Sequence, residues 1–336
     1  MVPGGAHLKI AVVVPVFNEQ ENLRELYRRL RGVFEKLQDI TWQVVYVNDG
    51  SNDSSIEIML EQCREDPRFS VIDLSRNFGH QAAISAGLAH ASADAVILMD
   101  ADLQDPPEII PELVKHWRQG AEVVRAERRT RKEKGLRRFG FETFHRVFTW
   151  ISDFPIPSQS GIFGLLDIKA VEELNRLPEK NRYLPGLRSW VGFRQEVIYY
   201  DREDRAAGEP KQTLRRLIRY ALDAIFSFSY KPLRLMTGIG ACISIGGFVL
   251  ACVFVVKRLW GIETAQTGFT TLITMILFLG GVQLVAIGLV GEYMARIYDE
   301  VKQRPLYIVS KLYGIEPPNR SGSAPSSHSA SQQDRF

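Results

Sequence analysis

The sequence predicts an α/β domain built on a parallel β-sheet and followed by two transmembrane helices. Three observations support this fold class. The first half of the 336-residue chain alternates short β-branched runs with amphipathic runs of helical period. Acidic residues directly follow three of the expected strands. The second half contains two long stretches without a charged side chain, and such stretches are typical of membrane spans.

The strands and helices are expected to alternate along the first half of the chain. Strands are predicted at residues 9–16, 43–47, 69–74 and 95–99. Helices are predicted at residues 19–37, 54–64, 81–91 and 106–117, the last with prolines at its favoured early positions. This order favours a parallel sheet with helices on both faces.

Polar side chains stand where three of these strands end, and ligands of such sheets bind beyond the carboxyl ends of the strands. They are Asn18 and Glu19, then Asp49, and then Asp100 and Asp102. Two carboxylates with Gln104 close by suit a hard divalent cation that also takes phosphate oxygens of a substrate.

Each acidic cluster also has a purely structural explanation. Asp105, which precedes two prolines, is suited to capping the next helix, but this leaves Asp100 and Asp102 unexplained. Asp49 lies in an Asn-Asp-Gly-Ser run that favours a turn. The functional alternative is that the Asp49 carboxylate accepts hydrogen bonds from a nucleobase or ribose.

Composition and motifs exclude several classes of protein. A chain with 45% hydrophobic and 24% charged residues is not disordered as a whole, and a net charge of +3 argues against bulk nucleic-acid binding. The three scattered cysteines fit neither a disulfide framework nor a four-ligand zinc site. Neither common glycine-rich phosphate loop appears. A nucleotide would thus be held by carboxylates and a metal, which favours sugar transfer over NTP hydrolysis or hydride transfer.

Uncharged stretches at residues 235–256 and 264–291 predict two membrane spans, at residues 233–256 and 264–291, joined by a short extracytoplasmic loop at 257–263. Nine basic residues flank the pair and two lie in the loop, so the positive-inside rule places both flanks and both termini in the cytoplasm. Glycines and Gln283 within the spans leave homo-oligomerisation open.

The rest of the chain is divided accordingly. Residues 1–210 are expected to form the cytoplasmic catalytic domain, and residues 211–232 an amphipathic juxtamembrane helix with apolar and basic faces. Residues 292–316 are expected to be a cytoplasmic juxtamembrane segment, and residues 317–336 a disordered tail rich in Ser, Pro, Asn and Gln.

Taken in order, the motifs resemble those of one family. They are Val14-Pro15-Val16-Phe17-Asn18-Glu19, Val47-Asn48-Asp49-Gly50-Ser51, Leu74-Ser75-Arg76-Asn77-Phe78-Gly79, the run from Asp100 to Pro107, and Gly291-Glu292-Tyr293-Met294 after the second span. The chain resembles the polyprenyl-phosphate glycosyltransferases of glycosyltransferase family 2, over roughly residues 8 to 315. Relatives include dolichol-phosphate mannose synthases and bactoprenol glucosyltransferases.

The resemblance implies a GT-A fold and an inverting transfer from a nucleotide sugar to a polyprenyl phosphate. It implies that the nucleotide sugar is held by Pro15, Asn18, Glu19, Asp49 and Asp100. It implies Mg²⁺ or Mn²⁺ on Asp100, Asp102 and Gln104, with Arg128 near the phosphates. The lipid phosphate would meet Arg137, Arg138 and Lys211.

The chain departs from the family pattern on the acceptor side. Bacterial members often carry Gly-Asp-Phe-Arg where this chain has Gly161-Ile162-Phe163-Gly164, so the acidic residue is replaced by Ile162. Arg125 stands where a small or aromatic residue is usual. Because the acceptor phosphate has a second pKa of about 6, it is ionised at neutral pH and needs no general base. The change at Ile162 therefore predicts a positioning defect rather than loss of the chemistry.

Three functions follow from this sequence. The leading hypothesis is a plasma-membrane enzyme that transfers one sugar, with glucose from UDP-glucose as first choice over GDP-linked donors. The second is a weakened or inactive homologue that acts as a nucleotide-sugar-binding scaffold. The third, a processive polysaccharide synthase, is disfavoured because the chain lacks the further spans and the Gln-x-x-Arg-Trp motif of such enzymes.

Overall fold

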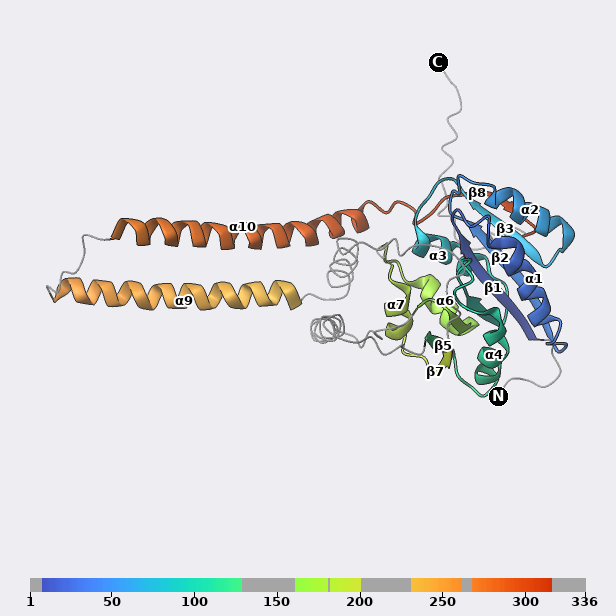
Figure 1. Cartoon of the computed structure of the whole chain (residues 1–336). Helices are drawn as coiled ribbons and strands as arrows, with labels where there is room; N and C mark the ends of the chain where they lie inside the picture. The colour runs from blue at the N-terminus through green and yellow to red at the C-terminus, as the bar shows by residue number, and fades with distance from the viewer. Residues whose placement is uncertain (1–7, 129–160, 181, 201–230, 261–267, 316–336) are drawn as a thin grey trace, which may run out of the picture.

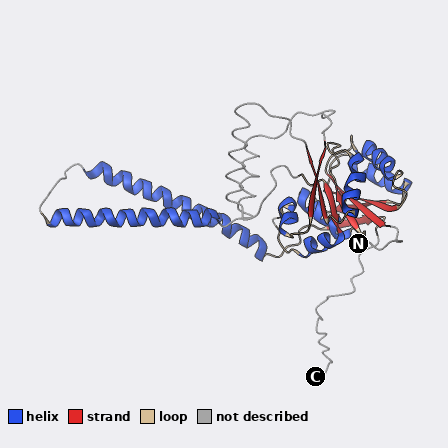
Figure 2. Ribbon diagram, turned by 90° about the horizontal axis from the view of Figure 1, so that it is seen from below, coloured by secondary structure: helices blue, strands red, loops and turns tan. Residues whose placement is uncertain are grey.

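The computed structural model describes residues 8–128, 161–180, 182–200, 231–260 and 268–315 (Figure 1). An eight-stranded sheet in the order β7-β5-β6-β4-β1-β2-β3-β8 forms the centre of one domain. Two long helices, α9 and α10, lie side by side and extend away from that domain (Figure 1). Helices cover the sheet, and its strands appear red among them in Figure 2.

Four parallel strands form the part of the sheet that the sequence predicts. They are β1 (Leu8–Val16), β2 (Ile40–Asn48), β3 (Phe69–Leu74) and β4 (Ala95–Leu98). Strand β1 pairs with β2 on one side and with β4 on the other, and β2 pairs with β3. The strand order thus reverses at β1, which is where open α/β sheets hold ligands.

Helices pack on both faces of the sheet, as predicted. One face carries α1 (Leu23–Phe34), α2 (Ser55–Glu65) and α4 (Ile110–Arg118), which follows the 3-10 turn Pro107–Ile109. The other face carries α3 (His80–His90), α6 (Ile168–Arg176) and α7 (Leu184–Trp190). Successive side chains of β1 alternate between the two cores, with Val12 on one face and Val13 on the other.

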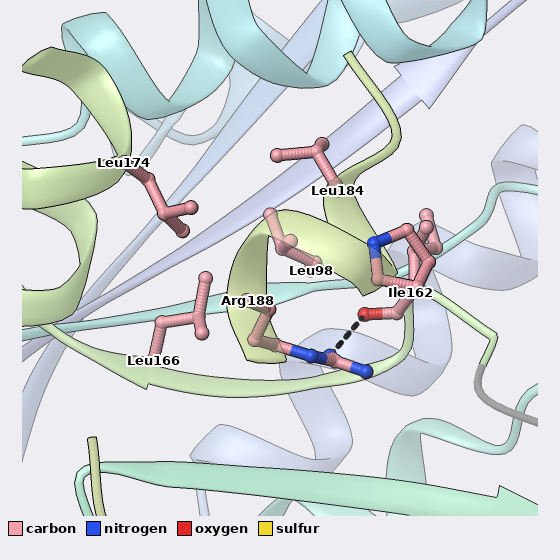
Figure 3. Close-up of a pocket in the computed structure, with 7 residues that line it drawn as sticks. Leu98, Ile162, Leu166, Leu174, Leu184 and Arg188 are labelled. Carbon is pink, nitrogen blue, oxygen red and sulfur yellow. Dashed lines mark hydrogen bonds between the residues drawn. The ribbon is translucent and has the colours of Figure 1, made fainter. Parts of the chain in front are cut away.

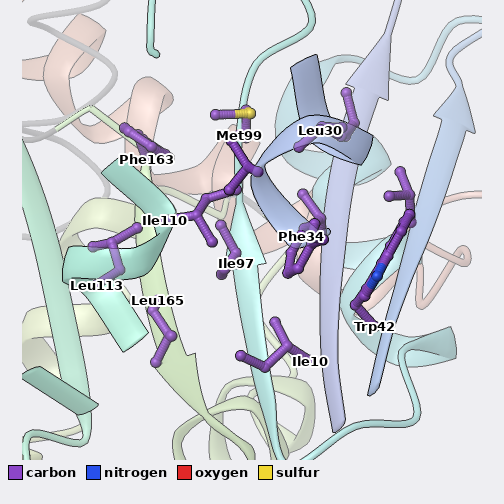
Figure 4. Close-up of a cluster of buried hydrophobic side chains, with 14 of the residues drawn as sticks. Ile10, Leu30, Phe34, Trp42, Ile97, Met99, Ile110, Leu113, Phe163 and Leu165 are labelled. Atoms are coloured by element: carbon purple, nitrogen blue, oxygen red, sulfur yellow. The ribbon is translucent and has the colours of Figure 1, made fainter. Parts of the chain in front are cut away.

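The core under α1 and α4 is dense and partly aromatic (Figure 4). The rings of Phe34 and Trp42 stack with centroids 4.8 Å apart, and both side chains are buried. Burial of such side chains contributes roughly 1.5–3 kcal/mol each, so this layer helps to hold α1 against the sheet.

The sheet is larger than predicted, and the strands added to the four parallel ones make it mixed. Strand β6 (Gly164–Asp167) runs antiparallel between β4 and β5 (Val123–Arg128), and β7 (Gln195–Tyr200) pairs in parallel with β5. Strand β8 (Val309–Tyr313) runs antiparallel to β3 at the opposite edge. Mixed sheets are common among large α/β folds, many of which carry an antiparallel strand on an otherwise parallel sheet.

Strand β8 changes the division of the chain. It follows the two long helices in sequence yet belongs to the sheet of the N-terminal domain. The expected juxtamembrane segment 292–316 therefore contains a strand of that domain, which was not predicted. Since the chain leaves this domain and returns to it, α9 and α10 form a hairpin whose two ends face the same domain.

The hairpin consists of α9 (Lys231–Leu259) and α10 (Gly268–Val301). By length and composition, Phe278–Val301 in α10 suffices to cross a bilayer, whereas the apolar stretch Met236–Val249 in α9 is shorter. More than half of the side-chain surface is exposed at Ile245, Phe248, Val249, Leu272, Ile276, Leu284, Val285 and Ile287. An apolar surface of this extent is unfavourable in water and marks an interaction with lipid or with another apolar surface.

Candidate functional site

The loops after β1 and β2 are joined into one unit. The side-chain oxygen of Asn18 accepts from the backbone of Asn52 at 2.8 Å, and the Asn18 amide donates to Ser51 Oγ at 3.1 Å. The Glu19 amide donates to Ser55 Oγ at 2.9 Å. Asn18 has a φ of 57°, a left-handed conformation that Asn adopts more readily than most residues. Pro15 lies in β1 beside Val47 of β2.

Asp49 ties the end of β2 to the start of α3. One carboxylate oxygen accepts from the amide of Phe78 at 2.7 Å, and the other accepts from the amide of Gly79 at 3.0 Å. Burial raises the pKa of this carboxyl group, and the two backbone donors oppose the rise. Gly50 permits the close packing, because a Cβ there would lie 2.5 Å from the Asn77 nitrogen. Asp49 therefore holds a loop, and its contact with a nucleoside stays a prediction.

The loop after β4 brings its carboxylates close to the loop that follows β1 and to the start of α3. His80 Nε2 lies 3.4 Å from Asp100 Oδ1. Burial raises the pKa of the Glu19 carboxyl group, and the nearby charge of Asp102 adds to the rise. The Asp102 carboxylate also accepts from the amide of Gln104 at 3.1 Å. Three acidic groups thus gather where the strand order reverses.

Asp105 does not cap a helix. The 3-10 turn Pro107–Ile109 begins without a side-chain cap, and the buried Asp105 carboxylate accepts from the hydroxyl group of Tyr200 in β7. The prediction that Asp105 caps the helix after the two prolines is therefore wrong. Capping does not account for Asp100 or Asp102 either.

The acidic residues provide oxygen ligands suited to a divalent cation, but they do not complete its coordination shell. Within the described ranges, no three His, Cys, Asp or Glu side chains are close enough to enclose a metal ion. Asp100, Asp102 and Glu19 nevertheless concentrate negative charge at one end of the sheet. Hard oxygen donors with remaining positions for phosphate oxygens are what Mg²⁺ and Mn²⁺ accept. The residues therefore fit a cation that arrives with a diphosphate.

Ile162 lies in a small apolar pocket beside the end of β4 (Figure 3). The side chains of Leu98, Leu166, Leu174 and Leu184 line it, together with Pro185 and Arg188. Arg188 donates to the carbonyl oxygens of Gly161 at 3.3 Å and Ile162 at 3.4 Å. Burial, and then the charge of Arg125, lowers the pKa of Arg188 to about 10.

A second arginine, Arg125, is partly buried and lies next to Arg188. Arg125 Nη1 is 2.8 Å from Glu127 Oε1, and both side chains are 13% exposed. A Cβ on Gly164 would lie 3.4 Å from Arg188 Nη1, so the guanidinium group occupies the space beside this glycine. The departures of this chain at 125, 162 and 164 therefore meet in one buried cluster next to Leu98, two residues before Asp100.

The other predicted site residues are placed only in part. Arg128 is the last residue of β5, beside Tyr200 of β7. The predicted lipid-phosphate ligands Arg137, Arg138 and Lys211 lie outside the described residues. Most of the expected amphipathic helix at 211–232 and all of the expected tail at 317–336 also lie outside the described residues.

Sequence reasoning missed two residues of this region. His80 was not singled out from the sequence, yet His80 lies against Asp100. Its position directly after the Asn77-Phe78-Gly79 loop was the available signal. Arg188 was not considered, and nothing in its local sequence indicates that it is buried.

An α/β sheet with acidic residues at its reversal point, and no phosphate loop in the sequence, is typical of a glycosyltransferase domain of the GT-A type. The chain matches the model of "Glycosyl transferase family 2" over residues 11–168 and that of the "GtrB C-terminal hairpin" over residues 231–297. The chain belongs to glycosyltransferase family 2, and the match confirms the predicted family.

Similar proteins span nearly the whole chain. The "Uncharacterized glycosyltransferase YkcC" of Bacillus subtilis is 44% identical over 92% of this chain and 96% of its own length. The "SfII prophage-derived bactoprenol glucosyl transferase" of Shigella flexneri is 41% identical over 92% of this chain and 100% of its own. The glucosyl-3-phosphoglycerate synthase of Mycobacterium tuberculosis, solved with Mn²⁺ and UDP, has a TM-score of 0.43 and 16% identity, over 67% of this chain and 84% of that one.

Proposed function

We propose that this glycosyltransferase transfers one sugar from a nucleotide sugar to a polyprenyl phosphate at the cytoplasmic face of the plasma membrane. The observation that carries this proposal is the gathering of Glu19, Asp100 and Asp102 at the reversal point of a sheet that is joined to an apolar helical hairpin. The acidic end suits the diphosphate of a donor with its cation, and the hairpin suits an acceptor that resides in lipid.

The residues of the chain have separate tasks in this reaction. Asn18, Glu19 and Asp49 shape the loops that would enclose the nucleoside, because their backbone and side-chain bonds connect the ends of β1, β2 and β3. Asp100, Asp102 and Gln104 would hold Mg²⁺ or Mn²⁺. When bound, such a cation stabilises the charge that develops on the leaving nucleoside diphosphate.

The acceptor supplies its own nucleophile. Its phosphate has a second pKa of about 6 and is ionised at neutral pH. A phosphate oxygen forms the bond to C1 of the sugar as the bond from C1 to the diphosphate oxygen breaks, which inverts the configuration at C1. Arg128, Arg137, Arg138 and Lys211 are proposed to bind the phosphates, and no carboxylate at position 162 is needed to remove a proton.

Glucose is the proposed sugar. Support comes from relatives named bactoprenol glucosyl transferase, with 41% identity over 92% of this chain for one from Shigella flexneri. UDP-glucose is therefore the donor expected to react, and undecaprenyl phosphate is a suitable acceptor to test.

The proposal is tested with full-length protein in detergent. Undecaprenyl phosphate is supplied with Mn²⁺ or Mg²⁺ and with labelled UDP-glucose, GDP-mannose or UDP-N-acetylglucosamine, and label in the organic phase is measured. Transfer from UDP-glucose is expected, with loss in Asp102→Ala and without metal. Asp39→Ala serves as a control, since this exposed carboxylate lies before β2, at the far end of the strands.

The outcomes separate the competing functions. Transfer from a different donor would correct the sugar and retain the reaction class. Binding of a nucleotide with Mn²⁺ but transfer from none of the donors would contradict the proposal and favour the non-catalytic scaffold.

We also propose that α9 and α10 carry the two predicted membrane spans, with both termini cytoplasmic. The support is the exposed apolar surface along both helices and the return of β8 to the sheet of the N-terminal domain. Homo-oligomerisation through the spans stays a prediction.

Cysteine labelling in intact cells tests this topology. In a variant with Cys63, Cys242 and Cys252 replaced, Trp260→Cys lies directly after α9 and Arg304→Cys lies after α10. A membrane-impermeant maleimide is expected to label residue 260 in intact cells, and residue 304 only after permeabilisation. Labelling of both in intact cells would contradict the proposed hairpin.

A further inference from the structure

One side chain outside the predicted site touches a predicted metal ligand. His80 is the first residue of α3, and its Nε2 lies 3.4 Å from Oδ1 of Asp100. The Asp100 side chain is 34% exposed, so it faces the open end of the sheet rather than the core. The contact therefore joins the start of α3 to the loop after β4.

The start of α3 is held in place from the side of β2. Asp49 accepts from the amides of Phe78 and Gly79, the two residues directly before His80. Asp49 is 3% exposed, so this attachment is shielded from water. The backbone at His80 is thus fixed by a buried carboxylate that is not itself part of the loop after β4.

The body of α3 is held against β1. A Cβ on Gly87 would lie only 2.2 Å from Val13 Cγ1, so the helix approaches the strand as closely as glycine allows. The buried side chains of Ala83, Ile84 and Leu88 fill the rest of this contact. With its start and its middle both fixed, α3 presents His80 at one defined position above the end of the sheet.

We propose that His80 is a positioning residue that orients the Asp100 carboxylate for the cation and diphosphate of the donor. This inference rests on the proposed function of the site. An imidazole N–H beside one carboxylate oxygen restricts rotation of the carboxylate and directs the other oxygen toward the ligand. Partners of metal ligands that act this way typically change metal affinity by about 10- to 100-fold when removed.

The test measures cation binding separately from sugar transfer. Full-length protein in detergent is titrated with Mn²⁺ in the presence of UDP, and in parallel of GDP, and free Mn²⁺ is followed by electron paramagnetic resonance. His80→Leu is expected to weaken Mn²⁺ binding by about 10-fold. His80→Gln, whose amide nitrogen reaches about as far as Nε2, is expected to retain most of the affinity, whereas the shorter His80→Asn is not.

The same helix supplies a matched control. His90 lies at the other end of α3, with Nδ1 2.8 Å from the carbonyl oxygen of Ala86. His90→Leu is expected to leave Mn²⁺ affinity unchanged. Thermal unfolding of each variant identifies those that are misfolded, and the pair His80→Gln and His80→Asn keeps the comparison between folded proteins if His80→Leu is unstable.

The outcomes distinguish this inference from the proposed function. Equal Mn²⁺ affinity in folded wild-type protein, His80→Leu and His80→Asn would overturn the positioning role, as would wild-type protein that binds no Mn²⁺ with either nucleotide. Weakened affinity in His80→Asn with rescue in His80→Gln supports it even if no sugar reaches polyprenyl phosphate. The absence of sugar transfer to polyprenyl phosphate in such a protein would count against the proposed acceptor alone.

Discussion

The guanidinium group of Arg188 donates to the carbonyl oxygen of Ile162 over 3.4 Å, so a buried cation lies beside the position at which the family resemblance implies an acidic side chain. Arg188 is 3% exposed, and Arg125 beside it is paired with Glu127. Arg125 is thus paired with the Glu127 carboxylate, and the charge of Glu127 also acts on the nearby Arg188. The replacement of an acidic residue by Ile162 is thus accompanied by a buried positive charge directly behind the same loop.

This arrangement predicts that the stability of a protein with a carboxylate at position 162 depends on Arg188. Ile162→Asp is expected to lower stability by about 1–3 kcal/mol, because a charged group replaces apolar contacts but has a cation in reach. In an Arg188→Met background the same change is expected to cost about 3–5 kcal/mol, since the buried charge is then unpaired. Unfolding of the four proteins in detergent measures the coupling, with Ile162→Leu as the isosteric control. Equal costs in both backgrounds would contradict the prediction.

The contact between α3 and β1 predicts a steric penalty at Gly87. Gly87→Ala is expected to destabilise the protein by about 1–3 kcal/mol through overpacking against Val13. Val13→Ala should restore part of the loss in the double variant. Gly32→Ala is the control: no atom lies within 4 Å of its added Cβ in α1, and alanine is favoured in a helix by roughly 0.5–1 kcal/mol. A Gly87→Ala protein as stable as wild type would show that α3 shifts freely.

The Asp66 carboxylate gives a prediction for pH. It accepts from the guanidinium group of Arg68 at 2.6 and 2.8 Å, and these bonds lower the pKa of Asp66. A folded-state pKa below the unfolded value of about 3.9 means that the stabilisation is present above that pH and is lost as pH falls through the folded value. Asp66→Asn should therefore cost about 1 kcal/mol at neutral pH, since Arg68 is partly exposed and its charge is screened.

Thermal unfolding at neutral pH and below the folded pKa checks this expectation. The difference between wild type and Asp66→Asn is expected to shrink in acid. Asp39→Asn provides the comparison, because the exposed Asp39–Arg118 pair should contribute little at either pH. A deficit of Asp66→Asn that stays constant with pH would assign it to something other than the carboxylate charge.

A residue of β8, which follows the hairpin in sequence, is expected to stabilise β3 and the loop that follows it. Leu312 pairs with Ile72 in register and packs on the core beside α3, and the Ser75 amide donates to the carbonyl oxygen of Ile308 at 3.0 Å. Leu312→Asp is expected to lower stability by about 2–4 kcal/mol, because it places a charge against apolar neighbours.

Hydrogen–deuterium exchange resolves where that loss occurs. Faster exchange is expected in β3 and in the loop from Ser75 to Gly79. Lys311→Asp, at an exposed position of the same strand, is the control that changes charge without burying it. Unaltered exchange in β3 of the Leu312→Asp protein would show that β8 does not support this edge.

The alternation of apolar and polar residues determined much of this protein without any tertiary information. It located β1 to β4 and the helices between them because the periods of 2 and 3.6 residues are local properties of the chain. It also placed Glu19, Asp49, Asp100 and Asp102 at strand ends, since side chains that follow a parallel strand must lie at its carboxyl edge. The apolar runs of α9 and α10 were visible for the same local reason.

Tertiary structure decided what depends on pairing between distant segments. Strand β8 pairs with β3 although the whole hairpin separates them in sequence, and β6 pairs antiparallel with its neighbours. Neither pairing could be predicted, because a local period does not encode which strands hydrogen-bond to each other. Packing likewise buried Arg188 next to the backbone of Ile162. It also brought the Tyr200 hydroxyl group to the Asp105 carboxylate, and the His80 imidazole to the Asp100 carboxylate. Each of these contacts joins residues at least 20 positions apart, and their meeting follows from how helices and strands pack, not from the residues that flank them in sequence.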